Sequence, residues 1–149
     1  MAAARDFARK RSECSSGSLL GMVRADAVAL EVRAERLRRL LDEDPADAML
    51  WFGLGRALLD LDRPSDAARA LESATQLNPE YTAAFRDLGR ALLESGDPSE
   101  AARIFAHAIA LAEKTGDLQT GREIHVFLKR AEKAGGSLKE SGISRETEP

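Results

Sequence analysis

Two histidines and one cysteine are the residues of this 149-residue chain best suited to metal binding or nucleophilic chemistry. His107 and His125 lie 18 residues apart in different helical segments, and no cysteine is near either of them. A zinc site needs three or four converging ligands, so this pair predicts ordinary surface or interhelix histidines and no metal site. Cys14 lies in a Ser- and Gly-rich stretch with only scattered arginines to lower its pKa, which argues against a nucleophile.

The acidic and glycine-containing stretches are equally poor candidates for catalysis. Asp60, Asp62 and Asp66 are close together, but on a predicted exposed turn they cap helices and face solvent. Gly53 and Gly55 lie inside a helical pattern, which favours helix packing over a phosphate-binding loop. We therefore expect a protein that is not an enzyme and that needs neither a metal nor a cofactor.

An internal repeat determines which elements carry any functional residue. Shifting residues 48–79 by 34 positions aligns them with residues 82–113. Such a period predicts stacked copies of one structural unit. The aligned pairs include Trp51 with Phe85, Gly55 with Gly89, and the run Arg56-Ala57-Leu58-Leu59 with the identical run Arg90-Ala91-Leu92-Leu93.

Each copy is predicted to form two antiparallel helices, because only two residues separate the helical runs. Asp44-Pro45 and Asn78-Pro79 are expected to cap and begin the first helix of each pair. Gly96 is expected to end a helix, and Asp97 to cap the next one in a capping box with Glu100. The predicted helices are Ala46–Leu61, Pro64–Leu77, Pro79–Ser95 and Pro98–Glu113.

Small residues on facing helices predict close packing within each pair. Gly55 against Ala67, and Gly89 against Ala101, would let two backbones approach where a larger side chain would separate them. Large residues at the open end, such as Trp51, fill the remaining space. Because one pair cannot bury its apolar face alone, the pairs must stack.

These residues resemble the tetratricopeptide repeat family, whose pattern is W-x2-L-G-x2-Y, then A-x3-F-x2-A, then P, over 34 residues. The resemblance covers about 66 residues and implies an all-α, right-handed α-solenoid of antiparallel helix pairs. Leu58 and Leu92 stand where the family prefers tyrosine, and Glu113 stands where it has proline. The first copy matches at Trp51, Leu54, Gly55, Ala67, Ala74 and Pro79, and the second at Leu88, Gly89, Ala101, Phe105 and Ala108.

The segments on either side of repeats 48–81 and 82–115 are predicted to complete a helical domain over residues 19–134. Leu19–Leu41 carries one apolar stripe and is either a degenerate half repeat or a single packing helix. Residues 118–134 are expected to form a capping helix that ends at Gly135-Gly136. Residues 1–18 and 135–149 are predicted to be disordered tails, although the arginine-rich start also has features of a transit peptide. The stripe consists of Val23, Ala27, Leu30, Ala34, Leu37 and Leu41.

Charge and hydropathy narrow the choice of partner and compartment. The net charge is only -3, which does not favour nucleic acid or an acidic membrane surface. No apolar run reaches the roughly 18 residues of a membrane span. A single cysteine fits a reducing compartment, so we expect a cytoplasmic protein without nucleic-acid or membrane partners.

Partner binding is the function that the resemblance implies. In the tetratricopeptide repeat family, the first helices of successive pairs line a concave groove that holds an extended peptide or a partner helix. Phe52 is either a binding residue or packs on the N-terminal helix. The arginines either pair with acidic groups of a ligand or are neutralised by Asp60, Asp87 and Glu94. The candidate partner-binding residues are Met49, Phe52, Arg56, Arg86 and Arg90.

We therefore expect an adaptor or scaffold that binds a segment or helix of a partner protein. The alternative is a self-associating structural module that forms a homo-oligomer through its terminal helices.

Overall fold

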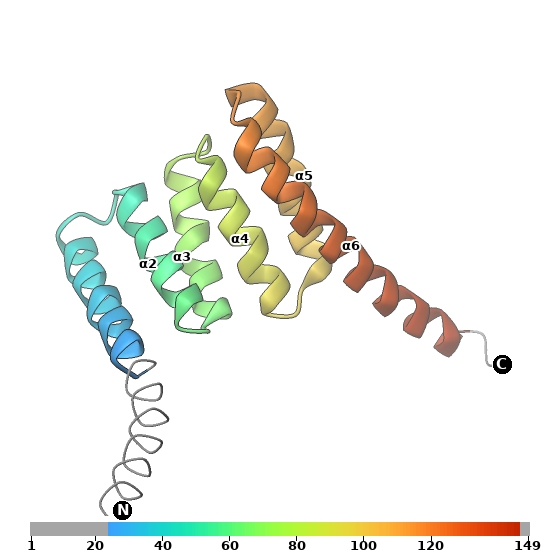
Figure 1. The fold of residues 1–149 in the computed structure, drawn as a ribbon, viewed down its shortest axis with the longest axis horizontal. Helices are drawn as coiled ribbons and strands as arrows, with labels where there is room; N and C mark the ends of the chain where they lie inside the picture. The colour runs from blue at the N-terminus through green and yellow to red at the C-terminus, as the bar shows by residue number, and fades with distance from the viewer. Residues whose placement is uncertain (1–23, 147–149) are drawn as a thin grey trace, which may run out of the picture.

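The computed structural model describes the backbone of residues 24–146 and the side chains of residues 24–136. This part of the chain contains helices and no strands, and the helices stack side by side in a row (Figure 1). The predicted all-α solenoid is therefore confirmed. Cys14, residues 19–23 and the expected tail 1–18 lie outside the described residues. The helices are residues 24–43 (the N-terminal helix), α2 (Ala48–Asp60), α3 (Pro64–Leu77), α4 (Thr82–Glu94), α5 (Pro98–Thr115) and α6 (Leu118–Glu146).

Tight turns with left-handed residues reverse the chain between helices. Asp62 between α2 and α3 has a φ of 58°, and Gly96 and Gly116 have φ values of 96° and 77°. Glycine adopts this region without the steric cost that a side chain brings. The short turns bring each helix against the next, and α2 also contacts α4, while α4 also contacts α6. One face of the solenoid is consequently formed by α2, α4 and α6.

The first and second helix of each pair meet at a glycine. A Cβ atom on Gly55 would lie 2.5 Å from Cγ of Leu71, and one on Gly89 would lie 2.4 Å from Cε1 of Phe105. The close approach is as predicted, but the nearest side chains across the interface are Leu71 and Phe105, not the predicted Ala67 and Ala101. The large residue projects into the space that the missing Cβ leaves, while the alanines lie buried beside it.

The N-cap of the first helix of each pair lies three residues after the predicted caps, Asp44 and Asn78. The N-cap of α2 is Asp47, whose carboxylate accepts from the backbone N–H groups of Met49 and Leu50 at 2.8 and 3.3 Å. The carboxylate of Asp44 instead accepts from the N–H of Ala46 and stabilises the preceding turn. The predicted caps are therefore wrong by the same offset in both copies, because each Pro lies in a turn before its helix.

The second helices begin where the sequence predicts. Both start at a proline, and α3 has the predicted bounds. Asp97 caps α5 by accepting from the N–H of Glu100 at 3.2 Å, whereas the Glu100 carboxylate pairs with Arg103 at 3.0 Å. Half of the predicted capping box is thus present, and the other half is replaced by a surface ion pair.

The last helix extends beyond its predicted end. α6 continues through Gly135 and Gly136 to Glu146, so the predicted stop at the glycine pair is wrong, and residues 135–146 are helical where a tail was expected. Glycine weakens a helix interior by about 1 kcal/mol but keeps its N–H donor, so it does not end a helix as proline does. The last turns of α6 project beyond the row of helices (Figure 1).

The N-terminal helix packs on α2 through the predicted stripe. Ala34 and Leu41 are buried, and Leu37 lies against the position where a Cβ on Gly53 would be, at 3.5 Å. The stripe is incomplete toward its beginning, because Ala27 is exposed. Val28 and Val32, on the opposite face of this helix, are each 62% exposed.

Candidate functional site

A hollow of about 210 Å³ lies on the face formed by α2, α4 and α6. No residue of α3 or α5 lines it. The predicted residues Arg56, Arg86 and Arg90 come together here, although they lie on two different helices. We call this hollow the arginine groove. It is lined by Arg56, Leu59, Asp60, Arg86, Asp87, Arg90, Glu123 and Phe127.

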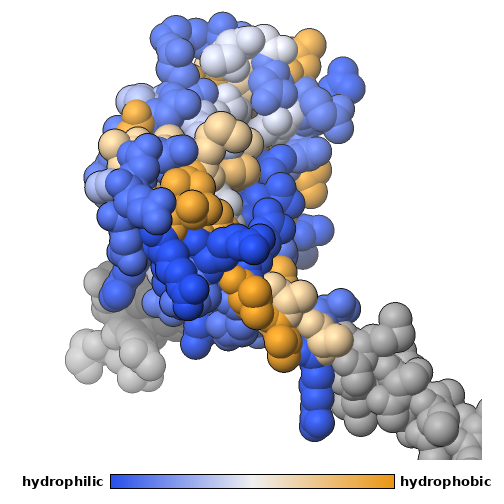
Figure 2. All heavy atoms as spheres, turned by 90° about the vertical axis from the view of Figure 1, so that its left-hand side faces the viewer, coloured by the Kyte–Doolittle hydropathy of each residue, from blue (hydrophilic) through white to orange (hydrophobic). Residues whose placement is uncertain are grey.

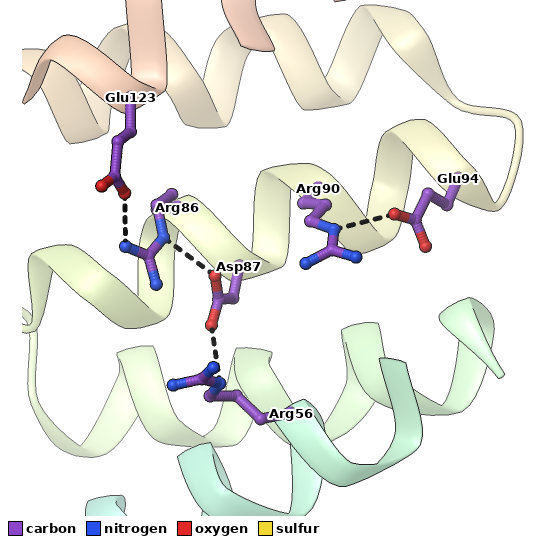
Figure 3. Close-up of polar contacts among 6 residues, drawn as sticks. All are labelled: Arg56, Arg86, Asp87, Arg90, Glu94 and Glu123. Atoms are coloured by element: carbon purple, nitrogen blue, oxygen red, sulfur yellow. Dashed lines mark hydrogen bonds and ion pairs between the residues drawn. The ribbon is translucent and has the colours of Figure 1, made fainter. Parts of the chain in front are cut away.

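Asp87 is the centre of the polar contacts in the arginine groove (Figure 3). Its side chain is only 6% exposed. One carboxylate oxygen accepts from Nε of Arg86 at 2.9 Å, and the other lies 3.8 Å from Nε of Arg56. Arg86 also donates to Glu123 on α6 at 2.8 Å. These contacts join the three helices across the floor of the groove.

The guanidinium of Arg86 is held firmly by its carboxylate neighbours. Burial alone would lower its pKa, but the hydrogen bond and charge of Asp87, together with Glu123, outweigh burial and raise it. Arg86 is 20% exposed and donates to two carboxylates, so it cannot turn toward a ligand without leaving the buried carboxylate of Asp87 unpaired. Its role in the groove is to fix Asp87 and to link α4 to α6.

Arg56 and Arg90 are held more loosely. Arg56 is 56% exposed, and its 3.8 Å separation from Asp87 is too long for a hydrogen bond. Arg90 is 42% exposed and pairs with Glu94 one turn later at 2.8 Å. Of the two alternatives that the sequence left open, neutralisation by acidic neighbours is present at Asp87 and Glu94, whereas pairing with a ligand stays a prediction. The pair of Arg90 with Glu94 is exposed on both sides, whereas Arg56 is exposed but faces a buried carboxylate.

Phe52 and Met49 lie outside the lining of the arginine groove. Phe52 is half-buried, with its ring centroid 4.7 Å from that of Tyr81, and the guanidinium of Arg56 lies 5.9 Å above the ring. Phe52 thus has packing contacts that the sequence did not reveal, and they include Tyr81. Met49, at the beginning of α2, is 71% exposed.

The contribution of α6 was missed because its register differs from that of the repeats. α4 begins at Thr82 and α6 at Leu118, which is 36 residues later and not 34. Counted from the helix start, Glu123 on α6 occupies the same sixth position as Asp87 on α4. Aligning the helix caps Tyr81 and Asp117 would have placed Glu123 beside the arginines.

The remaining chemical candidates do not form a second site. His107 packs edge-on against Phe85 at 4.8 Å, and Nδ1 of His125 lies 2.9 Å from the carbonyl oxygen of Gly121. Within the residues that the structure describes, no three His, Cys, Asp or Glu side chains gather closely enough to hold a metal ion. None of the helices in this part of the chain is long and apolar enough to cross a membrane.

Comparison with known proteins finds the same repeat in other chains. Tetratricopeptide repeat models match residues 34–67 and 58–122. Over 100 residues, the chain is 33% identical to the TPR repeat-containing protein PA0015 of Pseudomonas aeruginosa. This alignment spans 67% of the chain and 95% of that protein.

Solved structures share the fold. Protein BPP2914 from Bordetella parapertussis is 27% identical, with a TM-score of 0.59 over 76% of this chain and 94% of that one. PcrH in complex with the chaperone binding region of PopD is 19% identical, with a TM-score of 0.67 over 76% and 86% of the two chains. The TPR2B domain of yeast Sti1, in a complex with pHsp70, is 15% identical, with a TM-score of 0.63 over 72% and 96%.

Proposed function

Because this chain belongs to the tetratricopeptide repeat family, we propose that it is a protein-interaction module whose arginine groove binds a segment of a partner protein. The observation that carries the proposal is the convergence of Arg56, Arg86 and Arg90 from α2 and α4 on one hollow, closed at its far side by α6. Two of the similar solved structures are themselves complexes, one with the chaperone binding region of PopD and one with pHsp70.

The size of the groove favours recognition of side chains. Small-molecule sites usually enclose roughly 300–1,000 Å³, whereas this hollow has about 210 Å³. One or two side chains of a partner segment would fill it, and the rest of the segment would lie along the exposed face of α2, α4 and α6. We also propose a binding role without catalysis and, from the single cysteine, a reducing compartment such as the cytoplasm.

The loosely held arginines define the chemistry of the partner segment. Exposed ion pairs contribute only about 0–1 kcal/mol each. An incoming carboxylate can therefore replace Glu94 at Arg90, or bind the free edge of the Arg56 guanidinium, at little cost. A carboxylate bound by two guanidinium groups gains charge-assisted hydrogen bonds. We propose that the segment presents an acidic side chain to Arg56 and Arg90, while Arg86 stays bound to Asp87.

Phe52 and Met49 would extend the site toward the beginning of α2. Phe52 borders the groove, since the guanidinium of Arg56 stacks over its ring. Met49 lies one turn earlier on α2 and is the most exposed large apolar side chain of the described residues. An apolar side chain next to the acidic one in the partner segment would cover both residues and remove their surface from water.

Fluorescence anisotropy with labelled peptides tests this proposal. Three peptides of equal length carry a leucine beside a glutamate, a glutamine or a lysine. We expect the glutamate peptide to bind at least about tenfold more tightly than the others, and the difference to shrink at high salt. The double variant Arg56→Glu/Arg90→Glu should lose this preference, and Phe52→Ala should weaken binding of all three peptides.

A matched control uses an arginine outside the groove. Arg103 on α5 is 80% exposed and pairs with Glu100, so Arg103→Glu changes the net charge without touching the groove. This variant should bind the glutamate peptide like the unmodified protein. Equal affinity for the three peptides, or an unchanged preference in the double variant, would reject the groove as the binding site.

A further inference from the structure

The N-terminal helix exposes an apolar face at one end of the solenoid. Val28 and Val32 are each 62% exposed, and Leu40 is 40% exposed. A shallow hollow of about 460 Å³ lies on this face, lined by Val32 and Leu40 together with Glu35, Arg36 and Arg39. Figure 2, which views the molecule from this end, shows apolar patches interrupting a hydrophilic surface. The face is opposite to the one that packs on α2.

A second open surface follows the groove between α5 and α6 at the other end of the solenoid. One hollow of about 150 Å³ includes Ile109, Glu113 and Leu118, and one of about 350 Å³ includes Ala102 and the glycines Gly135 and Gly136. Since α5 and α6 are antiparallel, these hollows lie at opposite ends of the same helix pair. Leu118 is 65% exposed although it is apolar.

The two ends of the solenoid are complementary in their order of helices. Leu37 of the N-terminal helix lies 34 residues before Leu71 of α3, which in turn lies 34 before Phe105 of α5. The N-terminal helix therefore stands in the position of a second helix, and within the described residues it has no first helix beside it. α6 stands in the position of a first helix, and no described helix follows it.

We infer that the chain assembles head to tail, with the N-terminal helix of one copy docked in the α5–α6 groove of a second copy. The docked helix would take the place of a second helix beside α6, but through its exposed face, because Leu37, the counterpart of Phe105, already packs on α2. The apolar residues Val28, Val32 and Leu40 would then cover Ile109, Ala102 and Leu118.

The charges on the two surfaces favour the same orientation of the docked helix as the order of helices in the repeat. A second helix runs antiparallel to the first, so the C-terminal half of the docked helix must lie beside the start of α6. That half carries Arg36 and Arg39, and the start of α6 is lined by Glu113 and Asp117. Arg122 also lies there, but the two carboxylates leave this hollow acidic.

Of the charges that would meet in this contact, Arg36, Arg39 and Glu113 are weakly engaged within one copy, whereas Asp117 already accepts from the backbone N–H of Thr120 at 3.1 Å. Among the described residues, Arg36 and Glu113 have no ion-pair partner, and Arg39 approaches Glu35 only to 4.0 Å. Their pairing across the interface would therefore break no strong contact. The opposite charges at the start of α6 fix the direction of docking.

The contact is heterologous, because it joins two different surfaces of the same chain. Each added copy leaves one free helix and one free groove, so assembly continues with concentration unless a ring closes. A symmetric dimer of two N-terminal helices would instead stop at two copies and would leave the α5–α6 groove free. The two arrangements can be separated by blocking each surface alone.

Sedimentation velocity on the full chain and on two blocked variants tests the inference. Val32→Glu blocks the helix face, and Leu118→Glu blocks the groove. Both positions are largely exposed, so neither change disturbs the core. We expect the unmodified chain to form species larger than dimers as concentration rises, and each variant alone to remain monomeric. An equal mixture of the two variants should form dimers, since each supplies the surface that the other lacks.

Val126→Glu serves as the matched control, because Val126 lies on α6, is 54% exposed and lines neither hollow. It should assemble like the unmodified chain. A mixture that stays monomeric, assembly of Leu118→Glu alone, or a strict monomer of the unmodified chain at high concentration would each overturn head-to-tail assembly. Peptide binding by the arginine groove, on another face, is tested separately and does not depend on this result.

Discussion

Asp87 is the residue on which the geometry of the arginine groove depends. Among residues 24–136, it is the only charged residue that is buried. A buried carboxylate is tolerated only when it is paired and hydrogen-bonded, and Arg86 and Arg56 supply that pairing. Arg86 is bound to it at close range, whereas Arg56 remains partly free. Asp87 thus holds Arg86 closely and Arg56 only loosely, while Arg90 pairs with Glu94 at the surface.

Tyr81 gives a direct measure of this electrostatic environment. Burial, and next the negative charge of Asp87, raise the pKa of Tyr81 above its ordinary value, although Arg56 opposes them. Tyr81 is the only tyrosine of the chain, so the ultraviolet absorbance of the phenolate reports its titration alone. We expect a midpoint above about 10 in the folded protein, and a return to about 10 in denaturant.

The raised pKa of Tyr81 determines whether the free energy of unfolding rises or falls with pH. The stabilising contribution of neutral Tyr81 is fully present below the unfolded pKa near 10, and it is lost as pH rises through the higher folded value. The free energy of unfolding of Tyr81→Phe should therefore fall less steeply than that of the unmodified protein in this alkaline range. A folded midpoint at or below that in denaturant would contradict the environment described for Tyr81.

Two glycines on α2 should respond oppositely to the same substitution. At Gly55, an added Cβ would lie 2.5 Å from Cγ of Leu71, whereas at Gly53 it would lie 3.5 Å from Leu37. We expect Gly55→Ala to destabilise the protein by about 1–2 kcal/mol, because overpacking outweighs the gain in helix propensity. Gly53→Ala should instead stabilise it by up to about 1 kcal/mol. Urea unfolding measures both, and effects of equal sign would contradict the interhelix geometry.

At the scale of the elements, the first turn of α2 shows how local contacts decide where a helix begins. Asp47 binds two backbone N–H groups, and Nε1 of Trp51 donates to the carbonyl oxygen of Pro45 at 2.9 Å. The indole therefore anchors the turn that precedes the helix. The same offset occurs at α4, where Phe85 replaces Trp51, so the indole stabilises this turn but is not required for it.

The roles of Asp44 and Asp47 can be separated by alanine substitution. Asp47→Ala removes the N-cap and should lower the free energy of unfolding by about 1 kcal/mol. Asp44→Ala removes only a hydrogen bond in an exposed turn, so its effect should stay within about 0.5 kcal/mol. Thermal unfolding followed by circular dichroism compares them. A larger loss of stability in Asp44→Ala than in Asp47→Ala would indicate that Asp44 is the N-cap, as the sequence alone predicts.

The helices and their pairing could be predicted from sequence because the 34-residue period records which residues face each other. Trp51, Gly55 and Leu71 recur as Phe85, Gly89 and Phe105, and each set packs together. The helix starts could not be predicted, because Asp44 and Asp47 are both good caps and the conformation of the turn between them decides which one caps the helix. The prediction that Gly135 and Gly136 end the last helix was wrong, since glycine weakens a helix without ending it.

The site was predicted only in part for a similar reason. Helical periodicity placed Arg56, Arg86 and Arg90 on one face, which the structure confirms. Periodicity could not tell that Asp87 would be buried between two helices, because burial depends on the distance between α2 and α4. The position of Glu123 beside Arg86 depends on the two-residue shift of α6, which the 34-residue repeat does not predict. The assignment of the five candidate residues to partner binding remains a prediction.

At the scale of the whole molecule, the buried residues form two main clusters that adjoin at α4 and α5. The first contains Leu54, Leu71 and Ala34, and the second contains Phe105 and Ile124. Leu92 of α4 packs against both clusters. In repeat arrays, stability is approximately a sum of terms from each repeat and each interface between neighbours. The first pair should therefore keep part of its stability when the second is damaged.

The single tryptophan makes this partial independence measurable. Trp51 packs against the first cluster, whereas circular dichroism reports all helices. Phe105 is fully buried in the second cluster, and replacing it with alanine should remove about 3–5 kcal/mol there. In urea, Phe105→Ala should lose part of its helical signal before the fluorescence of Trp51 changes. The unmodified protein should show coincident transitions, because intact interfaces couple the two pairs.

Leu71→Ala is the control for this last experiment, because Leu71 is fully buried in the same cluster that Trp51 contacts. In Leu71→Ala, the change in Trp51 fluorescence should move to lower urea concentration. It should occur together with, or before, the loss of the helical circular dichroism signal. The two variants thus remove similar packing on opposite sides of Leu92. Helical signal should be lost first in Phe105→Ala, whereas Trp51 fluorescence should change first, or at the same time, in Leu71→Ala. Coincident transitions in both variants would mean that α2 to α6 unfold as one unit, with coupling across α3 and α4 stronger than either cluster alone.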